Sequence, residues 1–278
     1  MNDTIKYWPD VPHDGLTQIG ETLMTSEHEA LAYIPTGISG LDSTLHGGLP
    51  RGSVTVLAMR PILEIKTIPL EIAHHVASQT SKTVCLFDTK NDASVSALHM
   101  LSKLAGCQKP YQWSDAENPD ILENAWVQLH MLPIYVASKP GMKIGWLKKR
   151  LERAMKENGL QPDLIIVDSI QGMDETESRE DGVDKVMRQL KKIARRYEVA
   201  VIVTTDLKRD MESPKNRGTY LLDCPHPSMR KLADLVLYIY NEAIYDPETK
   251  SQSLELHVGE NRYMPRFGAV DSIKSPIR

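Results

Sequence analysis

The chain has 278 residues, enough for one large α/β domain or two smaller ones, since a domain contains about 150 residues. Its hydrophobic share of 41% and charged share of 25% are typical of a soluble globular protein, and it has neither a long apolar run nor a secretory signal, so we expect a cytoplasmic protein without a membrane span. The net charge of −4 excludes a globally basic nucleic-acid coat, and three widely spaced cysteines exclude a disulfide framework and a zinc ribbon.

The polar, weakly periodic residues 1–30 are interpreted as an N-terminal extension. The next segment, TGISGLDSTLHGG, predicts one short helix ended by a glycine turn. Apolar, β-branched runs then alternate with segments of helical spacing, and continuous apolarity indicates strands buried on both faces. The runs occupy 53–59, 83–88, 132–138, 163–169 and 199–205, and the helical segments occupy roughly 67–80, 92–106, 142–157 and 182–197. This alternation predicts an α/β fold with a doubly wound sheet and five central, buried parallel strands.

The C-terminal part has a different pattern. Residues 234–271 read as three strands separated by turns, with one turn at Asp246-Pro247 and the next at Tyr263-Met264-Pro265. Strands joined by short turns are antiparallel, so we expect an antiparallel extension of the same sheet. The predicted domain therefore spans residues 31–271, and residues 272–278 form a tail.

The loop after the first strand is the expected place for a ligand, because open parallel sheets bind ligands at the carboxyl ends of their strands. A phosphate-binding loop there needs glycines, followed by a lysine and a serine or threonine. The loop RPILEIKT has no glycine, and Glu64 brings a negative charge toward the phosphate position. The fourth strand ends in Asp168, which either coordinates a metal ion or simply ends the strand.

Several motifs, in order, resemble the RecA-like motor domain of DnaB-type replicative helicases, a P-loop NTPase fold, with an opening segment similar to the RadA and KaiC branch. The opening segment is TGISGLDSTLHGGLPRGSVTVLA, followed by MRP before the loop and LIIVDSIQGM at the fourth strand. KLADLVLYIYNEAIYD and GENRYMPRFGAV resemble the family's two C-terminal motifs. The resemblance runs from about residue 34 to 271, and it implies a site for ATP and magnesium.

The chain departs from the family at that site. The resemblance places the site at Arg60, Pro61, Glu64, Ile65, Lys66, Thr67, Lys90, Asp168 and Asp206. Glu64 and Ile65 fall on the glycine and lysine of the cradle, Lys90 falls on the catalytic glutamate, and Asp206 falls on the phosphate-sensing glutamine. A one-residue insertion could restore Lys66-Thr67 as the lysine–threonine pair, but the glycines would still be missing. Phosphate chemistry needs positive charge and a polarised water, so we predict a degenerate site with no catalytic residue, cofactor or metal ion.

Two further roles follow from the resemblance. Arg262 matches the arginine finger that ring-forming relatives direct into a neighbour's site, although Glu260 replaces the family's lysine. Candidate contacts to single-stranded DNA lie in a segment that matches a channel-lining loop, namely Lys208, Arg209, Lys215 and Arg217. The other channel loop, QGMDETESREDG, is acidic and would repel phosphate. The basic stretches 146–153 and 185–196 are interpreted as solvated helix faces.

Three functions remain open. We favour a non-hydrolysing RecA-fold subunit that serves assembly or regulation in DNA replication or repair, as an oligomer with itself or with helicase subunits. The alternatives are an active, magnesium–ATP-dependent DNA helicase with an atypical phosphate loop, and a binding scaffold unconnected with DNA. Thermal stabilisation by magnesium–ATP separates the first two, and salt-dependent binding to single-stranded DNA separates the first from the third.

Overall fold

The computed structural model describes residues 33–59, 68–107, 119–176, 180–207, 226–241, 254–262 and 272–275. The chain divides into two compact units, Met1–Tyr33 and Ile34–Arg278, and nearly all the described residues belong to the second. A minor two-stranded sheet pairs β1 (Tyr33–Ile34) with β2 (Leu49–Pro50). No helix within these described ranges is long and apolar enough to cross a membrane.

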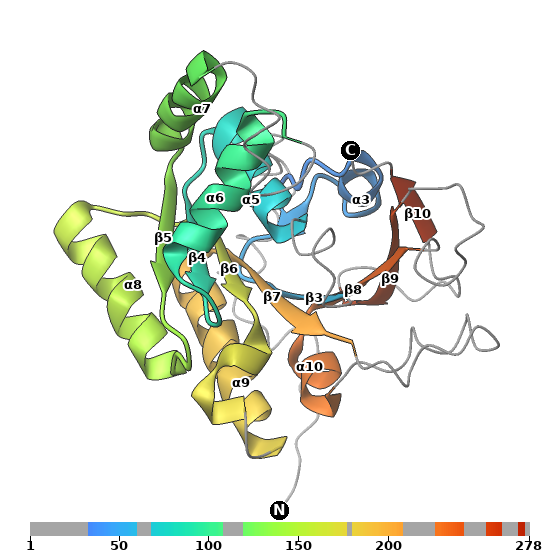
Figure 1. Ribbon diagram of the computed structural model, residues 1–278. Coiled ribbons are helices and arrows are strands. Elements are labelled where there is room, and N and C mark those ends of the chain that lie inside the picture. The colour runs from blue at the N-terminus through green and yellow to red at the C-terminus, as the bar shows by residue number, and fades with distance from the viewer. Residues whose placement is uncertain are drawn as a thin grey trace, which may run out of the picture. The chain divides into compact units, whose positions relative to one another are not determined.

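Among the described residues, an eight-stranded sheet forms the centre of the second unit (Figure 1). Its order is β10-β9-β8-β3-β7-β6-β4-β5. The strands are β3 (Val54–Met59), β4 (Val84–Asp88), β5 (Ile134–Ser138), β6 (Leu164–Asp168), β7 (Ala200–Asp206), β8 (Leu235–Asn241), β9 (Leu254–Asn261) and β10 (Ser272–Ser275). Strands β3 to β8 run parallel to one another, whereas β9 and β10 pair antiparallel. The predicted mainly parallel sheet with antiparallel C-terminal strands is therefore confirmed.

Two details of the strand prediction are wrong. β5 is not central but forms one edge of the sheet, and most of its residues are only half-buried. β8 pairs in parallel with β3, with Val236 opposite Val56, so the antiparallel extension begins at β9 rather than at residue 234. The chain enters β8 from α10 (Pro227–Leu232), and a strand reached through a helix can return in the parallel direction. β10 lies beyond residue 271, within the segment predicted as a tail.

Helices cover both faces of the sheet (Figure 1). One face carries α8 (Ile144–Asn158), α9 (Glu180–Tyr197) and α10, and the other carries α3 (Ser39–Thr44), α5 (Ile68–Thr80) and α6 (Ala93–Leu104). α7 (Pro119–Met131), which the periodicity did not predict, precedes β5 and contacts α6. It escaped prediction because several of its apolar residues face solvent rather than a core, including Trp126 and Met131.

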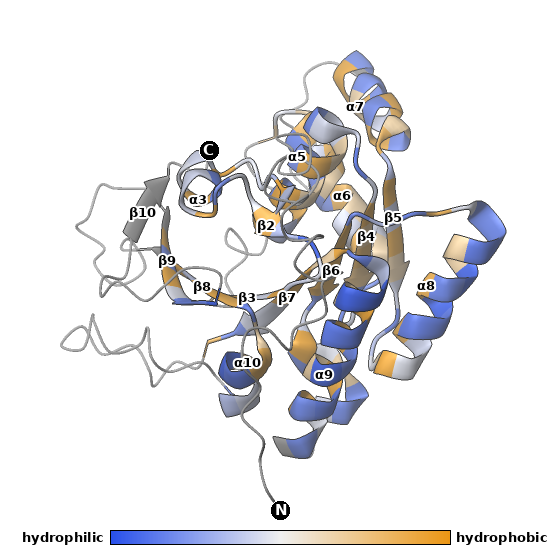
Figure 2. Cartoon of the chain, turned by 180° about the vertical axis from the view of Figure 1, so that it is seen from behind, coloured by the Kyte–Doolittle hydropathy of each residue, from blue (hydrophilic) through white to orange (hydrophobic). Residues whose placement is uncertain are grey.

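The two cores follow from the alternation of side chains along each strand. Val54, Val56 and Ala58 of β3 pack with α8, α9 and α10, whereas Leu57 and Met59 pack toward α3 and α5. All five are buried, and each large aliphatic side chain buried in this way contributes about 1.5–3 kcal/mol. Figure 2 shows the hydrophobic colour on the strands and the hydrophilic colour on the outer surfaces of α8 and α9.

Candidate functional site

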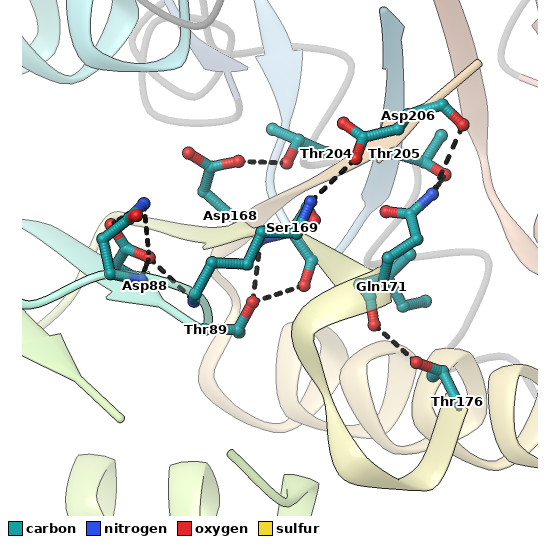
Figure 3. Close-up of polar contacts among 12 residues, drawn as sticks. Asp88, Thr89, Asp168, Ser169, Gln171, Thr176, Thr204, Thr205 and Asp206 are labelled. Carbon is teal, nitrogen blue, oxygen red and sulfur yellow. Dashed lines mark hydrogen bonds and ion pairs between the residues drawn. The ribbon is translucent and has the colours of Figure 1, made fainter. Parts of the chain in front are cut away.

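Three neighbouring strands end in aspartates at the carboxyl edge of the sheet. Asp88 ends β4, Asp168 ends β6 and Asp206 ends β7, and Asp88 lies directly opposite Asp168 in the strand register. The side chains of these residues gather in one region (Figure 3). Each carboxylate has different partners, so the three residues have different chemical roles.

The carboxylate of Asp88 holds the loop that follows β4. Its side chain is buried, and Oδ1 accepts hydrogen bonds from the backbone N–H groups of Lys90 at 2.9 Å and Asn91 at 2.8 Å. Oδ2 accepts the hydroxyl of Ser96 at 3.2 Å. Sequence reasoning missed this residue, although an aspartate that ends a strand before a polar turn is a signal for such bonds to the backbone.

Asp168 is held by residues from both neighbouring strands. Its Oδ1 accepts the hydroxyl of Thr204 at 2.5 Å, and its backbone carbonyl accepts the N–H of Thr89 at 2.9 Å. Thr89 also donates its hydroxyl to the Ser169 carbonyl at 2.6 Å. Within the described part of the chain, no group of three or more histidine, cysteine or acidic side chains could hold a metal ion.

An ion pair crosses the site between the ends of β4 and β7. The ammonium of Lys90 lies 2.7 Å from Oδ2 of Asp206, and the two side chains are 32% and 28% exposed. Gln171 lies beside this pair and donates its Nε2 to the Thr205 hydroxyl at 2.6 Å (Figure 3). The structure therefore brings Lys90 and Asp206 together at the strand tips beside Asp168.

Most of the other predicted site residues lie outside the described residues. These are the loop residues Arg60, Pro61, Glu64, Ile65, Lys66 and Thr67, and the DNA-binding candidates Lys208, Arg209, Lys215 and Arg217. Their predicted roles stay predictions.

Arg262 lies at the other end of the strands, where β3 and β8 begin. Its backbone N–H donates to the carbonyl of Asp234 at 2.9 Å, and Asp234 accepts the N–H of Val54, the first residue of β3, at 3.0 Å. The Arg262 guanidinium donates to the Lys231 carbonyl at the end of α10. Glu260 forms an ion pair with Arg230 of the same helix at 2.6 Å. Arg262 is thus remote from the site at the ends of β4, β6 and β7.

An open, mainly parallel sheet with helices on both faces and polar groups at its strand tips is the architecture of the RecA-like α/β class. The chain matches the family model of the DnaB-like helicase C-terminal domain over residues 33–274. It belongs to that family.

Two curated relatives show how far the similarity extends. The replicative DNA helicase DnaC of Bacillus subtilis is 27% identical over 245 residues, which cover 84% of this chain and 52% of the relative. The replicative DNA helicase DnaB of Geobacillus stearothermophilus is 26% identical over 247 residues, with the same shares covered. The chain thus spans about half the length of these relatives.

Solved structures agree on the fold. A DnaB-like replicative helicase, studied with its interactions with primase, superposes with a TM-score of 0.77 at 20% identity, covering 98% of this chain and 64% of that one. The ATPase domain of G40P gives a TM-score of 0.77 at 19% identity, covering 94% and 93% of the two chains. At this identity the likeness establishes the RecA-like core.

Proposed function

We propose that this chain is a non-hydrolysing member of its family that acts as an assembly or regulatory subunit in DNA replication or repair. One observation carries the proposal: the Lys90 ammonium, at the family's catalytic glutamate position, is ion-paired with Asp206 at 2.7 Å. A general base must accept a proton from the attacking water, and an ammonium has no lone pair with which to accept it. Loss of such a base alone costs about 10²–10⁴ in rate.

The charge distribution also argues against a bound magnesium ion that assists hydrolysis. The Asp206 carboxylate is already paired with the Lys90 ammonium, and the Asp88 carboxylate accepts backbone N–H groups, so both are engaged and cannot readily join Asp168 in binding a cation. In the sequence, Glu64 and Ile65 remove the glycine and lysine that a phosphate cradle needs. These residues do not suit magnesium-dependent phosphoryl transfer, and the proposal assigns no cofactor.

Phosphate release from ATP tests the proposal directly. The purified full chain, with magnesium and with or without single-stranded DNA, is expected to release no more phosphate than the Asp168→Ala variant. Turnover above this background that disappears in Lys66→Ala would mean that the shifted Lys66-Thr67 pair works, and the chain would be an active helicase motor. Magnesium–ATP should also leave the melting temperature unchanged. A chain that binds it would instead gain about 2.7 kcal/mol of unfolding free energy at a ligand concentration of a hundred times Kd, and its melting temperature would rise.

The connection with DNA is the second part of the proposal. Lys208, Arg209, Lys215 and Arg217 fall on a channel-lining loop in the family resemblance, and backbone contacts of this kind weaken steeply with salt. Binding of a labelled oligothymidylate of about 20 nucleotides should fall with rising salt and should be lost when these four residues become glutamate. Salt-independent binding, or none, would favour a scaffold unconnected with DNA.

Association with other RecA-like subunits, of the same or another kind, is the third part. Arg262 lies at the end of the sheet opposite the strand tips, so a finger role would be toward another subunit's nucleotide and not toward its own. We therefore propose that the chain packs beside an ATPase-competent family member and presents Arg262 to it. The alternative is an ordinary hairpin arginine, whose guanidinium only donates to the Lys231 carbonyl.

A further inference from the structure

A basic groove lies on the face of the sheet that carries α8 and α9. It is a cavity of about 710 Å³ between the N-terminal half of α8, the middle of α9 and the 3₁₀ helix η4 (Asp174–Thr176). This volume falls within the range of about 300–1,000 Å³ that is usual for ligand sites. Its lining includes five lysines, Lys139, Lys143, Lys148, Lys149 and Lys185, against two acids, Asp174 and Glu175.

The two acids are already engaged. The carboxylate of Glu175 accepts the backbone N–H of Ile144, at 3.1 and 3.3 Å, and so caps the start of α8. Asp174 lies 3.9 Å from the ammonium of Lys143. By contrast, Lys149 on α8 and Lys185 on α9 are exposed and form no ion pair within the described part of the chain. The groove therefore carries a positive charge that its own residues do not neutralise.

The bottom of the groove is apolar. Ile144 is 5% exposed and Ile193 is 3% exposed, and Pro140 and Trp146 lie beside them in the lining. The Lys139 ammonium sits 5.7 Å from the centre of the Trp146 ring, so a cation already covers that ring. Gly141, at φ +66°, lies so close to Asp174 that a Cβ there would collide with the carboxylate.

We propose that this groove binds an acidic segment of a partner protein in which carboxylates alternate with apolar side chains. Carboxylates would pair with the lysine rim, and apolar side chains would contact the exposed Pro140 and the small accessible parts of Ile144 and Ile193. An apolar centre with a polar rim is the usual organisation of a protein interface. A nucleic-acid strand fits less well, because Asp174 and Glu175 would face its phosphates and Trp146 is not free for base stacking.

Selection from a random peptide library tests the proposal. Displayed peptides of about 12 residues, which reach about 40 Å when extended, are selected on the full wild-type chain after depletion on Lys149→Glu/Lys185→Glu. Enriched peptides should combine glutamate or aspartate with leucine, isoleucine or phenylalanine. A labelled enriched peptide should bind this double variant at least about tenfold more weakly by fluorescence anisotropy, a difference of about 1.4 kcal/mol.

The controls separate groove binding from general charge effects. Lys192→Glu/Arg195→Glu makes the same change in net charge at exposed α9 positions outside the groove, and it should change the affinity less than about twofold. The peptide with every acidic residue replaced by its amide should lose binding. The proposal is overturned if no acidic–apolar peptides are enriched, if both double variants weaken binding equally, or if only an oligothymidylate binds through Lys149 and Lys185.

Discussion

At the residue scale, Lys90 and Asp206 compensate each other's charge at the strand tips. Placing a lysine or an aspartate alone at the strand tips would leave a charge without a partner, but at 2.7 Å each neutralises the other. The resemblance predicted that both residues lie at one site, because the carboxyl ends of parallel strands meet at one edge. The ion pair itself could not be predicted, since it needs the order β4-β6-β7 and a side chain that reaches across β6.

A double-mutant cycle should measure this compensation. We expect Lys90→Ala and Asp206→Ala to show a coupling free energy of about 0.5–1 kcal/mol in urea unfolding, reduced from the value of a buried pair because nearly a third of each side chain is exposed. The exchange Lys90→Asp/Asp206→Lys should recover part of the loss, whereas Lys90→Asp alone should be the least stable variant. Strictly additive losses would show that the pair contributes nothing.

Cys85, the second residue of β4, carries a second prediction at this scale. Burial raises the pKa of its thiol from 9.0 to about 12, so the folded protein keeps the thiol neutral. In Cys107→Ser/Cys224→Ser, a thiol reagent at pH 8 should label Cys85 only at the rate of unfolding. Above pH 9 the unfolded state loses this proton and the folded state does not, so stability should fall as pH rises from 9 toward 12. Rapid labelling of the folded protein would contradict the burial.

At the element scale, Asp234 joins three elements. Asp234 lies directly before β8 begins. Its carboxylate accepts hydrogen bonds from the Lys191 ammonium of α9 at 2.8 Å and from the backbone N–H of Val54 in β3 at 3.0 Å. The ion-paired side chains are only 15% and 10% exposed. In the sequence, Asp234 lies within the motif KLADLVLYIYNEAIYD, and its contacts with α9 and β3 depend on the parallel return of β8.

Asp234→Ala should therefore cost about 3 kcal/mol of unfolding free energy, because the Val54 backbone N–H loses its acceptor and the largely buried Lys191 ammonium keeps the Leu232 carbonyl but loses its carboxylate. The matched control is Asp184→Ala on α9, which removes an exposed partner of Arg188 and should leave the urea midpoint nearly unchanged. Equal losses in the two variants would mean that the burial of the Lys191–Asp234 pair does not matter.

The pattern of elements was predictable where burial is symmetric. β3, β4, β6 and β7 are buried on both faces, which produces continuous apolar runs in the sequence. β5 has a similar apolar run but lies at the edge of the sheet. The run does not reveal this position, because apolar residues of an edge strand can also pack against both cores. Sequence also cannot distinguish a solvated basic helix from the wall of a groove. Only the packing of α8 beside α9 shows that Lys148, Lys149 and Lys185 line the same cavity.

At the scale of the whole molecule, the order of several weak motifs predicted the RecA-like core, because each motif fixes one strand end in the same sheet. Assembly could not be predicted in the same way, since it depends on which surfaces remain free. Glu260 and Arg262 illustrate this: within one chain the first pairs with Arg230, and the second donates to the Lys231 carbonyl, so both residues brace α10 against β9. A role toward a neighbour requires Arg262 to exchange that carbonyl for a phosphate.

The last prediction tests this exchange. The chain is mixed with an ATPase-active DnaB-family helicase from the same cell, and ATP turnover is measured. If Arg262 completes the neighbour's site, Arg262→Ala should reduce the turnover gained on mixing by about 10³-fold, because an arginine finger stabilises the charge of the transferred phosphoryl group. Arg230→Ala is the matched control, since it removes a guanidinium from the same edge and leaves Arg262 in place. A gain in turnover with Glu260→Lys would instead show that Glu260 blocks the neighbour's site. Unchanged turnover in both Arg262→Ala and Glu260→Lys would rule out either role, because neither side chain would then reach a nucleotide.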